Sequence, residues 1–173
     1  MSISLYAATI PSYRQTLGAV SGLLRTAQAF CAEKRMEASE LIQARLAPDM
    51  LPFAYQVKST AVHSLGAIEG VRRGVFSPDR TPPPETFAAL EARVADTSSA
   101  LEAIQPSEIE SFIGRDMRFE SGNHRLEFTA EDFLLSFSLP NFYFHAATAY
   151  DILRWKGAPI GKRDFMGRLR LRV

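Results

Sequence analysis

Asn141 and His145 are the residues whose type and spacing point most directly to chemistry. They lie four positions apart in LPNFYFHAATAYDILRW, residues 139–155, and this spacing places both side chains on one face of a helix. The helix is apolar on nearly every side, so other elements or a second subunit must surround it. A buried polar group without a partner costs about 1–3 kcal/mol. Each of the two is therefore expected to bond to the other, to backbone or buried water, or to a ligand.

The ligand interpretation gives each side chain a role. Neutral imidazole is a common metal ligand and, with an ordinary pKa near 6.5, a general base, so His145 is the candidate catalytic and metal-binding residue. Asn141 would orient a ligand by hydrogen bonds or act as a weak metal ligand, since one imidazole and one amide hold a divalent ion poorly. Tyr143 and Tyr55 are candidate hydrogen-bond donors if they face inward.

Further candidate ligands stand in an earlier helical segment. Asp49, Gln56 and His63 are spaced by seven residues, which places them along one flank of a helix. Seven residues advance a helix by about 10 Å, so the three cannot all reach one ion. Asp49 is also predicted as the N-cap of this helix, and Gln56 and His63 would face solvent if that flank lies on the rim. His124 is predicted to be exposed in a turn.

The end of the chain is basic. Lys162, Arg163, Arg168, Arg170 and Arg172 outweigh Asp164 in residues 161–173. A solvated tail anchored by Phe165 is the simpler interpretation. In the alternative, Lys162 and Arg163 fold back over the helices and bind an anionic ligand.

Composition and missing motifs narrow the function. The net charge is +1 over 173 residues, so no nucleic-acid or membrane partner is predicted. Cys31 is the single cysteine, which excludes an intramolecular disulfide, and its place on an apolar stripe predicts a buried, inert thiol. HExxH, GxSxG, Walker and GxGxxG motifs are absent, which disfavours the corresponding enzyme classes. No leader or membrane-spanning pattern is recognisable, so a cytoplasmic protein is predicted.

The apolar periodicity predicts four helices. The first covers residues 6–31, with its first turns kinked or separated by Pro11. The second runs from Asp49 to Val71, the third covers 87–104, and the fourth runs from the Thr129 cap to Trp155. Before the fourth, residues 117–129 alternate around a Gly-Asn turn and predict a β-hairpin. The expected fold is all-α: one domain, residues 1–173, forming a four-helix bundle with a small hairpin inserted before the last helix.

Three motifs carry a family resemblance: RLAPDMLPFAYQV (45–57), LPNFYFHAATAYDILR (139–154) and GAPIGKRDFMG (157–167). They resemble a bacterial and fungal domain family of unknown function that is grouped with the DinB/YfiT-like proteins. The resemblance implies a four-helix bundle, often a homodimer. The wider superfamily includes metal-dependent thiol S-transferases and a thiol-dependent maleylpyruvate isomerase.

The superfamily's metal site, for zinc or nickel, uses one histidine of the second helix and an HxxxH pair of the fourth. His145 matches the second position of the pair, and Asn141 replaces the first histidine. Asp49, Gln56 and His63 remain alternatives for the second-helix position. The resemblance thus implies a transferase or isomerase with a degenerate metal site or a small-ligand site. The alternative is a non-catalytic dimeric bundle that binds a partner, for example in a stress response.

Overall fold

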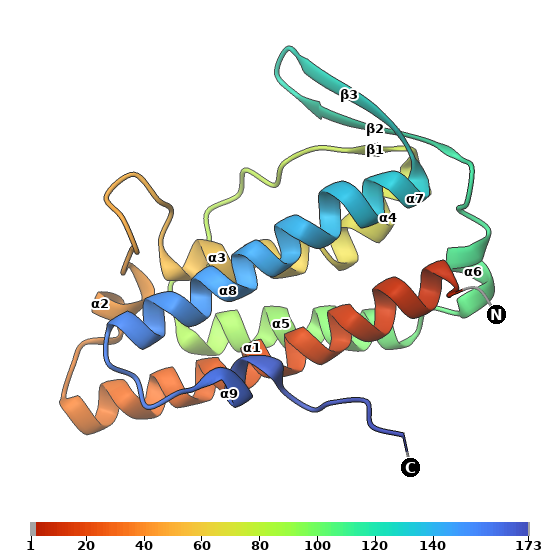
Figure 1. Cartoon of the computed structure of the whole chain (residues 1–173). Coiled ribbons are helices and arrows are strands. Elements are labelled where there is room, and N and C mark those ends of the chain that lie inside the picture. The colour runs from red at the N-terminus through yellow and green to blue at the C-terminus, as the bar shows by residue number, and fades with distance from the viewer. Residues whose placement is uncertain (1–2, 173) are drawn as a thin grey trace.

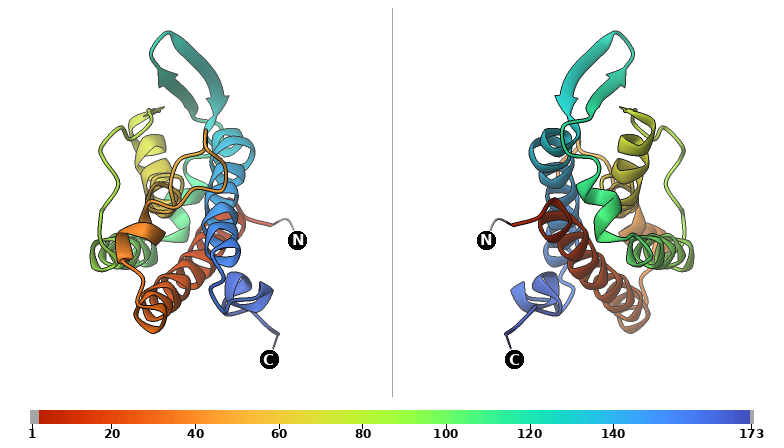
Figure 2. Two further views of the ribbon diagram at one scale, coloured as in Figure 1. Left: turned by 90° about the vertical axis from the view of Figure 1, so that its left-hand side faces the viewer. Right: turned by 90° about the vertical axis from the view of Figure 1, so that its right-hand side faces the viewer.

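The computed structural model describes residues 3–172, and most of the chain is helical (Figure 1). Helix α1 (Leu5–Lys34) packs against α5 (Phe87–Glu102) and α8 (Leu139–Trp155), and α3 (Phe53–Val62) packs against the same two helices. The end-on views show these segments around a common core (Figure 2). The other helical elements are α2 (Ala38–Ile42), α4 (Leu65–Arg73), α6 (Pro106–Glu110), α7 (Ala130–Asp132), the π-helical η1 (Phe133–Ser138) and α9 (Lys162–Met166). None of the helices within residues 3–172 combines the length and the apolar character needed to cross a bilayer.

Helix α1 is continuous, so the prediction that Pro11 separates its first turns is wrong. Ser4 caps the helix, with its hydroxyl accepting from the amide of Ala7 at 3.1 Å. Pro11 removes one amide donor, the one that would bond Ala7 in the α-helical pattern. Its neighbours Ile10 and Tyr13 are fully buried. Their burial stabilises the helical path by more than one missing backbone bond costs.

The predicted second helix is divided in two. The prediction that Asp49 caps it is wrong: α3 begins after Pro52, and Asp49 lies in an exposed turn. The chain then breaks between α3 and α4 at His63 and Ser64, where Ser64 has φ −116° and ψ −88°. The break frees the carbonyl of His63, which accepts a hydrogen bond from the Ser138 hydroxyl of η1 at 2.7 Å.

A three-stranded sheet stands over one end of the helices (Figures 1 and 2). Strands β2 (Asp116–Ser121) and β3 (His124–Thr129) form an antiparallel hairpin around Gly122 and Asn123. The sequence did not indicate β1 (Val75–Phe76), which pairs in parallel with β2. The sheet joins the helices through a cluster of phenylalanine rings at positions 76, 119, 128, 133 and 137.

The predicted fourth helix contains a wide turn. As predicted, Thr129 caps its start, accepting from the amide of Asp132 at 3.3 Å. In η1 the amide of Leu139 bonds the carbonyl of Leu134, five residues back, which is the π-helical pattern. Pro140 follows directly and has no amide donor to offer. The wide turn therefore coincides with the place where the regular α-helical ladder is interrupted.

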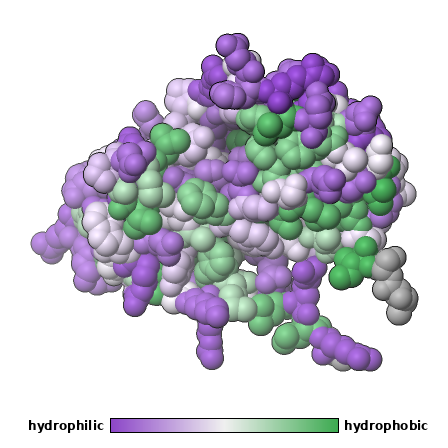
Figure 3. Space-filling model, turned by 45° about the horizontal axis from the view of Figure 1, so that its top comes forward, coloured by the Kyte–Doolittle hydropathy of each residue, from purple (hydrophilic) through white to green (hydrophobic). Residues whose placement is uncertain are grey.

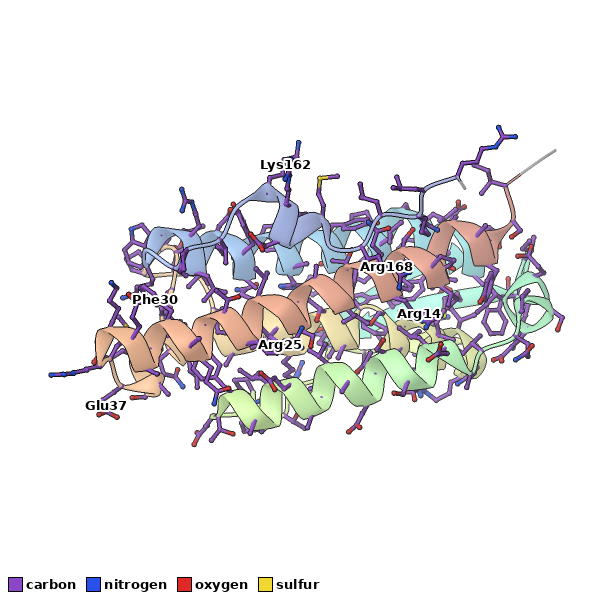
Figure 4. The ribbon with its side chains drawn as sticks, turned by 90° about the horizontal axis from the view of Figure 1, so that it is seen from below. Arg14, Arg25, Phe30, Glu37, Lys162 and Arg168 are labelled. Carbon is purple, nitrogen blue, oxygen red and sulfur yellow. The ribbon has the colours of Figure 1, made fainter. Side chains whose placement is uncertain are left out.

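The segment after α8 returns along α1. Helix α9 packs on α1, and the ring centroids of Phe165 and Tyr150 are 5.8 Å apart. Seen from below, α9 runs beside α1 and Lys162 points away from the helices (Figure 4). Gly167 follows α9 directly and lies against α1. Its backbone has φ +61° and ψ −148°, a conformation that only glycine adopts readily. A Cβ there would lie 3.1 Å from Cβ of Ala19 and 3.2 Å from the carbonyl oxygen of Gln15.

Gly167→Ala is expected to lower the free energy of unfolding by about 2–3 kcal/mol, because it combines backbone strain with a close approach to α1. Gly122→Ala is the matched control, since Gly122 has φ +58° and nothing within 4 Å of the added Cβ. The control should cost only about 1 kcal/mol. Urea unfolding of both variants measures the difference, and equal losses would show that α9 is not held against α1 in this way.

Candidate functional site

His145 lies in a cavity of about 210 Å³ between α3, the η1–α8 segment and the chain that follows α4. Hydrophobic side chains gather beside the polar hairpin on the face that comes forward in Figure 3. Phenylalanine rings share the lining with six polar or titratable side chains, so the cavity combines apolar walls with several convergent hydrogen-bonding groups. The lining residues are Tyr55, Ser59, Val62, His63, Phe76, Pro78, Asp79, Phe119, Phe137, Asn141 and His145.

Gln56 fixes the protonation of His145. Its side-chain nitrogen donates to the carbonyl of Leu51 at 2.8 Å, which leaves its oxygen 2.7 Å from Nδ1 of His145. Because an amide oxygen only accepts, Nδ1 must carry the proton. The neutral ring then has its lone pair on Nε2, and none of the described residues bonds that atom. His145 thus offers a hydrogen-bond acceptor to the cavity.

His63 offers the complementary group. Its ring stacks on that of His145, with centroids 5.5 Å apart and planes inclined by 19°. Nδ1 of His63 is buried and has no partner among the described residues. An unpaired buried N–H is less tolerable than an unpaired lone pair, so the proton belongs on Nε2. The pocket therefore combines an acceptor from α8 with a donor from the C-terminal end of α3.

Both imidazoles stay neutral well below their ordinary range. Burial, followed by repulsion from His145, lowers the pKa of His63 from 6.5 to about 4. Burial lowers the pKa of His145 from 6.5 to about 4 as well. A charge on either ring would be desolvated and would face the other ring, so at neutral pH both are uncharged hydrogen-bonding groups.

Asn141 lines the cavity and also supports the backbone. Its side-chain nitrogen donates to the carbonyl of Phe137 at 2.7 Å, where Pro140 interrupts the helix. Asn141 and His145 share a face, as their spacing predicts, but their bonds go to different partners. One N–H of the Asn141 amide and its oxygen remain to contact a ligand.

Asp79 brings a carboxylate to the cavity wall. Burial opposes its ionisation, but hydrogen bonds from Thr81 and the nearby Lys58 ammonium outweigh burial and lower its pKa to about 2. Lys58, with 1% of its side chain exposed, lies 3.1 Å from one carboxylate oxygen, and Arg93 lies 3.1 Å from the other. Lys58 also donates to the carbonyls of Asp79 and Thr81. These bonds hold the loop after β1 against α3.

The other predicted site residues lie elsewhere. Tyr143 is 39% exposed and does not line the cavity, whereas Tyr55 does, 6.0 Å from His145 between ring centroids. Asp49 is exposed in the turn before α3. Lys162 and Arg163 are exposed on α9, which packs on α1 and not over the cavity.

The donor set does not fit the zinc or nickel site that the resemblance implies. Within residues 3–172, no three His, Cys, Asp or Glu side chains come together in a way that could hold a metal ion. His63 and His145 are stacked with nearly parallel rings. A zinc or nickel site with three protein ligands would need a third donor beside this pair, and Asn141, whose amide nitrogen bonds the carbonyl of Phe137, is a poor ligand for such an ion.

Sequence reasoning missed Asp79, Lys58 and the aromatic walls. Lys58 carried a usable signal, because it interrupts the apolar run FAYQVKSTAV of α3, and a buried lysine needs an anionic or carbonyl partner. Asp79 carried no such signal, since it belongs to a loop rich in turn residues. Only the fold brings that loop to the cavity.

Comparison with known proteins finds a matching family and a solved structure with a similar fold. A family described as a domain of unknown function (DUF1993) matches residues 5–166. The crystal structure of a DinB family member protein from Shewanella denitrificans is similar, with a TM-score of 0.81 and 24% sequence identity. The alignment covers 98% of this chain and 95% of that one, so the two share a fold. No curated protein matches the chain.

Stability is expected to fall as the pH is lowered from about 6.5 to about 4. Over this window the unfolded chain protonates His63 and His145, whereas the folded chain resists because both pKa values lie at about 4. The unfolded state then binds more protons, so acid favours unfolding. The expected loss attributable to the pair is on the order of 3 kcal/mol after allowance for partial exposure.

Urea unfolding at pH 7, 6, 5 and 4 measures this loss. The double variant His63→Gln/His145→Gln should flatten the pH dependence, whereas His124→Gln, at the exposed start of β3, should retain it. An unchanged slope in the double variant would contradict the assignment of neutral stacked imidazoles.

Proposed function

The chain belongs to the family described as a domain of unknown function (DUF1993), and we propose that it is a DinB-like four-helix bundle that binds a small, uncharged molecule bearing a hydroxyl group. The observation that carries this proposal is the adjacent donor and acceptor of the two stacked imidazoles. A hydroxyl group donates one hydrogen bond and accepts others. It would donate to Nε2 of His145 and accept from the Nε2 proton of His63.

The surroundings favour an uncharged ligand. Phe76, Phe119 and Phe137 form apolar walls, and an isolated charge inside such walls would lose its hydration. The Asp79 carboxylate is already paired with Lys58 and Arg93, so it does not require a cation. A hydroxyl group on an aromatic or aliphatic body satisfies both the imidazoles and the walls.

The same geometry favours binding over catalysis. A general base works best when its pKa is near the working pH, and burial lowers the pKa of His145 to about 4. A reaction that used His145 as its general base would need the ring to accept a proton, which this environment opposes. Hydrogen bonding from a neutral ligand requires no change of charge. His145 is therefore proposed as the principal ligand-binding residue and not as a base.

Phenol and anisole test the proposal, because they have similar aromatic bodies but only phenol has a hydrogen to donate. Wild-type protein should bind phenol about 2- to 10-fold more tightly than anisole, the value of one hydrogen bond. His145→Phe keeps an aromatic ring in the stack and should bring the ratio close to one. His124→Gln should leave it unchanged. NMR titration of each ¹⁵N-labelled protein with phenol and with anisole gives the dissociation constants for the three ratios.

Equal binding of phenol and anisole by the wild-type protein would contradict the proposal. A preference for phenol that persists in His145→Phe would contradict the role of His145. Tight-binding natural ligands will be larger than phenol, but the ratio isolates the contribution of the imidazole from that of the apolar body.

Exposed apolar side chains favour a second proposal, that the chain forms a homodimer through the outer side of η1 and α8. Leu135 (41% exposed), Phe144 (56%) and Trp155 (61%) lie along this segment. Large exposed apolar side chains are enriched at protein interfaces, and these three are distributed along the length of one helical segment. Such a dimer is compatible with a ligand in each subunit, because the cavity faces α3 and not this side.

Size-exclusion chromatography with light scattering, over a hundredfold range of protein concentration, is expected to show a mass near twice 19.2 kDa. Leu135→Arg places a charge on the proposed interface and should shift the population toward monomer. A monomer mass for the wild-type protein at every concentration would contradict the dimer.

A further inference from the structure

A second, larger hollow lies beside the histidine cavity. It has a volume of about 780 Å³ and runs between α3–α4, the loop after β1 and α5. It exists because small side chains face one another across the helices, where Ala61 and Gly66 oppose Ala89, Ala92 and Ala100. The break after α3 adds to it, since α4 makes fewer contacts with α5 than α3 does. We call this hollow the alanine cleft.

The alanine cleft and the histidine cavity meet at common walls. Val62, Phe76 and Asp79 line both spaces. Asp79 is held at this junction by Lys58 on one side and Arg93 on the other. These two ion pairs hold the Asp79 carboxylate in the wall that the two spaces share.

The sizes of the two spaces indicate how they would be used. Ligand pockets commonly measure about 300–1,000 Å³, and the histidine cavity, at about 210 Å³, is smaller than this range. It suits a head group. The alanine cleft, at about 780 Å³, supplies the remaining space directly beside it.

We propose that one elongated ligand occupies both spaces, with a hydroxyl head between His63 and His145 and an apolar chain or ring system in the alanine cleft. This inference rests on the proposed function for the head group. The apolar body would contact Val62, Leu65 and Phe76 together with the alanines of α5. Glu69, Arg73 and Asp96 also line the cleft, so a polar group on the ligand would find charged partners beyond the apolar part.

A pair of phenols that differ only in an alkyl tail tests the inference. 4-Hexylphenol should bind the wild-type protein at least tenfold more tightly than phenol, since each fully buried methylene group contributes about fourfold. Ala92→Trp fills the cleft from the exposed surface of α5 and should remove most of this gain without altering phenol binding. Ala95→Trp is the matched control, because Ala95 is also exposed on α5 but does not line the cleft.

Each result is a ratio of two dissociation constants in one variant, measured by the same NMR titration. The inference would be overturned if the wild-type protein bound 4-hexylphenol less than twofold more tightly than phenol. It would also be overturned if Ala92→Trp kept the full wild-type preference for 4-hexylphenol. Failure of the head-group proposal is separately visible, because it appears as loss of the preference for phenol over anisole. The two failures therefore cannot be confused.

Discussion

The hydrogen bond between Gln56 and His145 joins α3 to α8 inside an apolar interior, and the candidate site depends on it. Gln56 is 2% exposed, and its amide is held by the backbone carbonyl of Leu51. The amide therefore has one orientation, and that orientation places the imidazole proton on Nδ1. Without this bond either nitrogen of His145 could carry the proton, and the group offered to a ligand would be undefined.

Two helix irregularities face each other around this bond. The α3–α4 chain breaks at His63, and the segment before α8 widens into a π-helical turn at η1. Ser138 of η1 donates to the carbonyl that the break leaves free, so η1 satisfies the exposed backbone group of the break. Because a break in the backbone of one helix is costly to bury alone, their pairing explains why both can sit in the interior. The two stacked imidazoles therefore lie where both helical segments depart from regular α-helical geometry.

The types of the main elements could be predicted because amphipathic periodicity is local. The stripes of α1 and α5, the Gly122 turn of the hairpin and the Thr129 cap are all encoded within a few residues. The interruptions were predicted less well. Pro11 suggested kinked or separate first turns, whereas α1 runs through it as one helix with Ile10 and Tyr13 buried. The break at Ser64 has no proline, and Gly66 two residues later lies inside α4, so the break is supported instead by the hydrogen bond from Ser138.

The sequence by itself determined that polar groups lie within an apolar helix: the i, i+4 spacing of Asn141 and His145 places them on one face, and burial forces them to find partners. It could not choose between Asp49, Gln56 and His63, because seven-residue spacing keeps all three on one flank of a regular helix. The tertiary structure decided this. Gln56 and His63 both contact His145, because α8 passes over the end of α3 and the chain breaks after His63, while Asp49 stays in an exposed turn before the helix. Long-range packing between α3 and α8 sets the distances from Gln56 and His63 to His145, and a local sequence pattern cannot predict such packing.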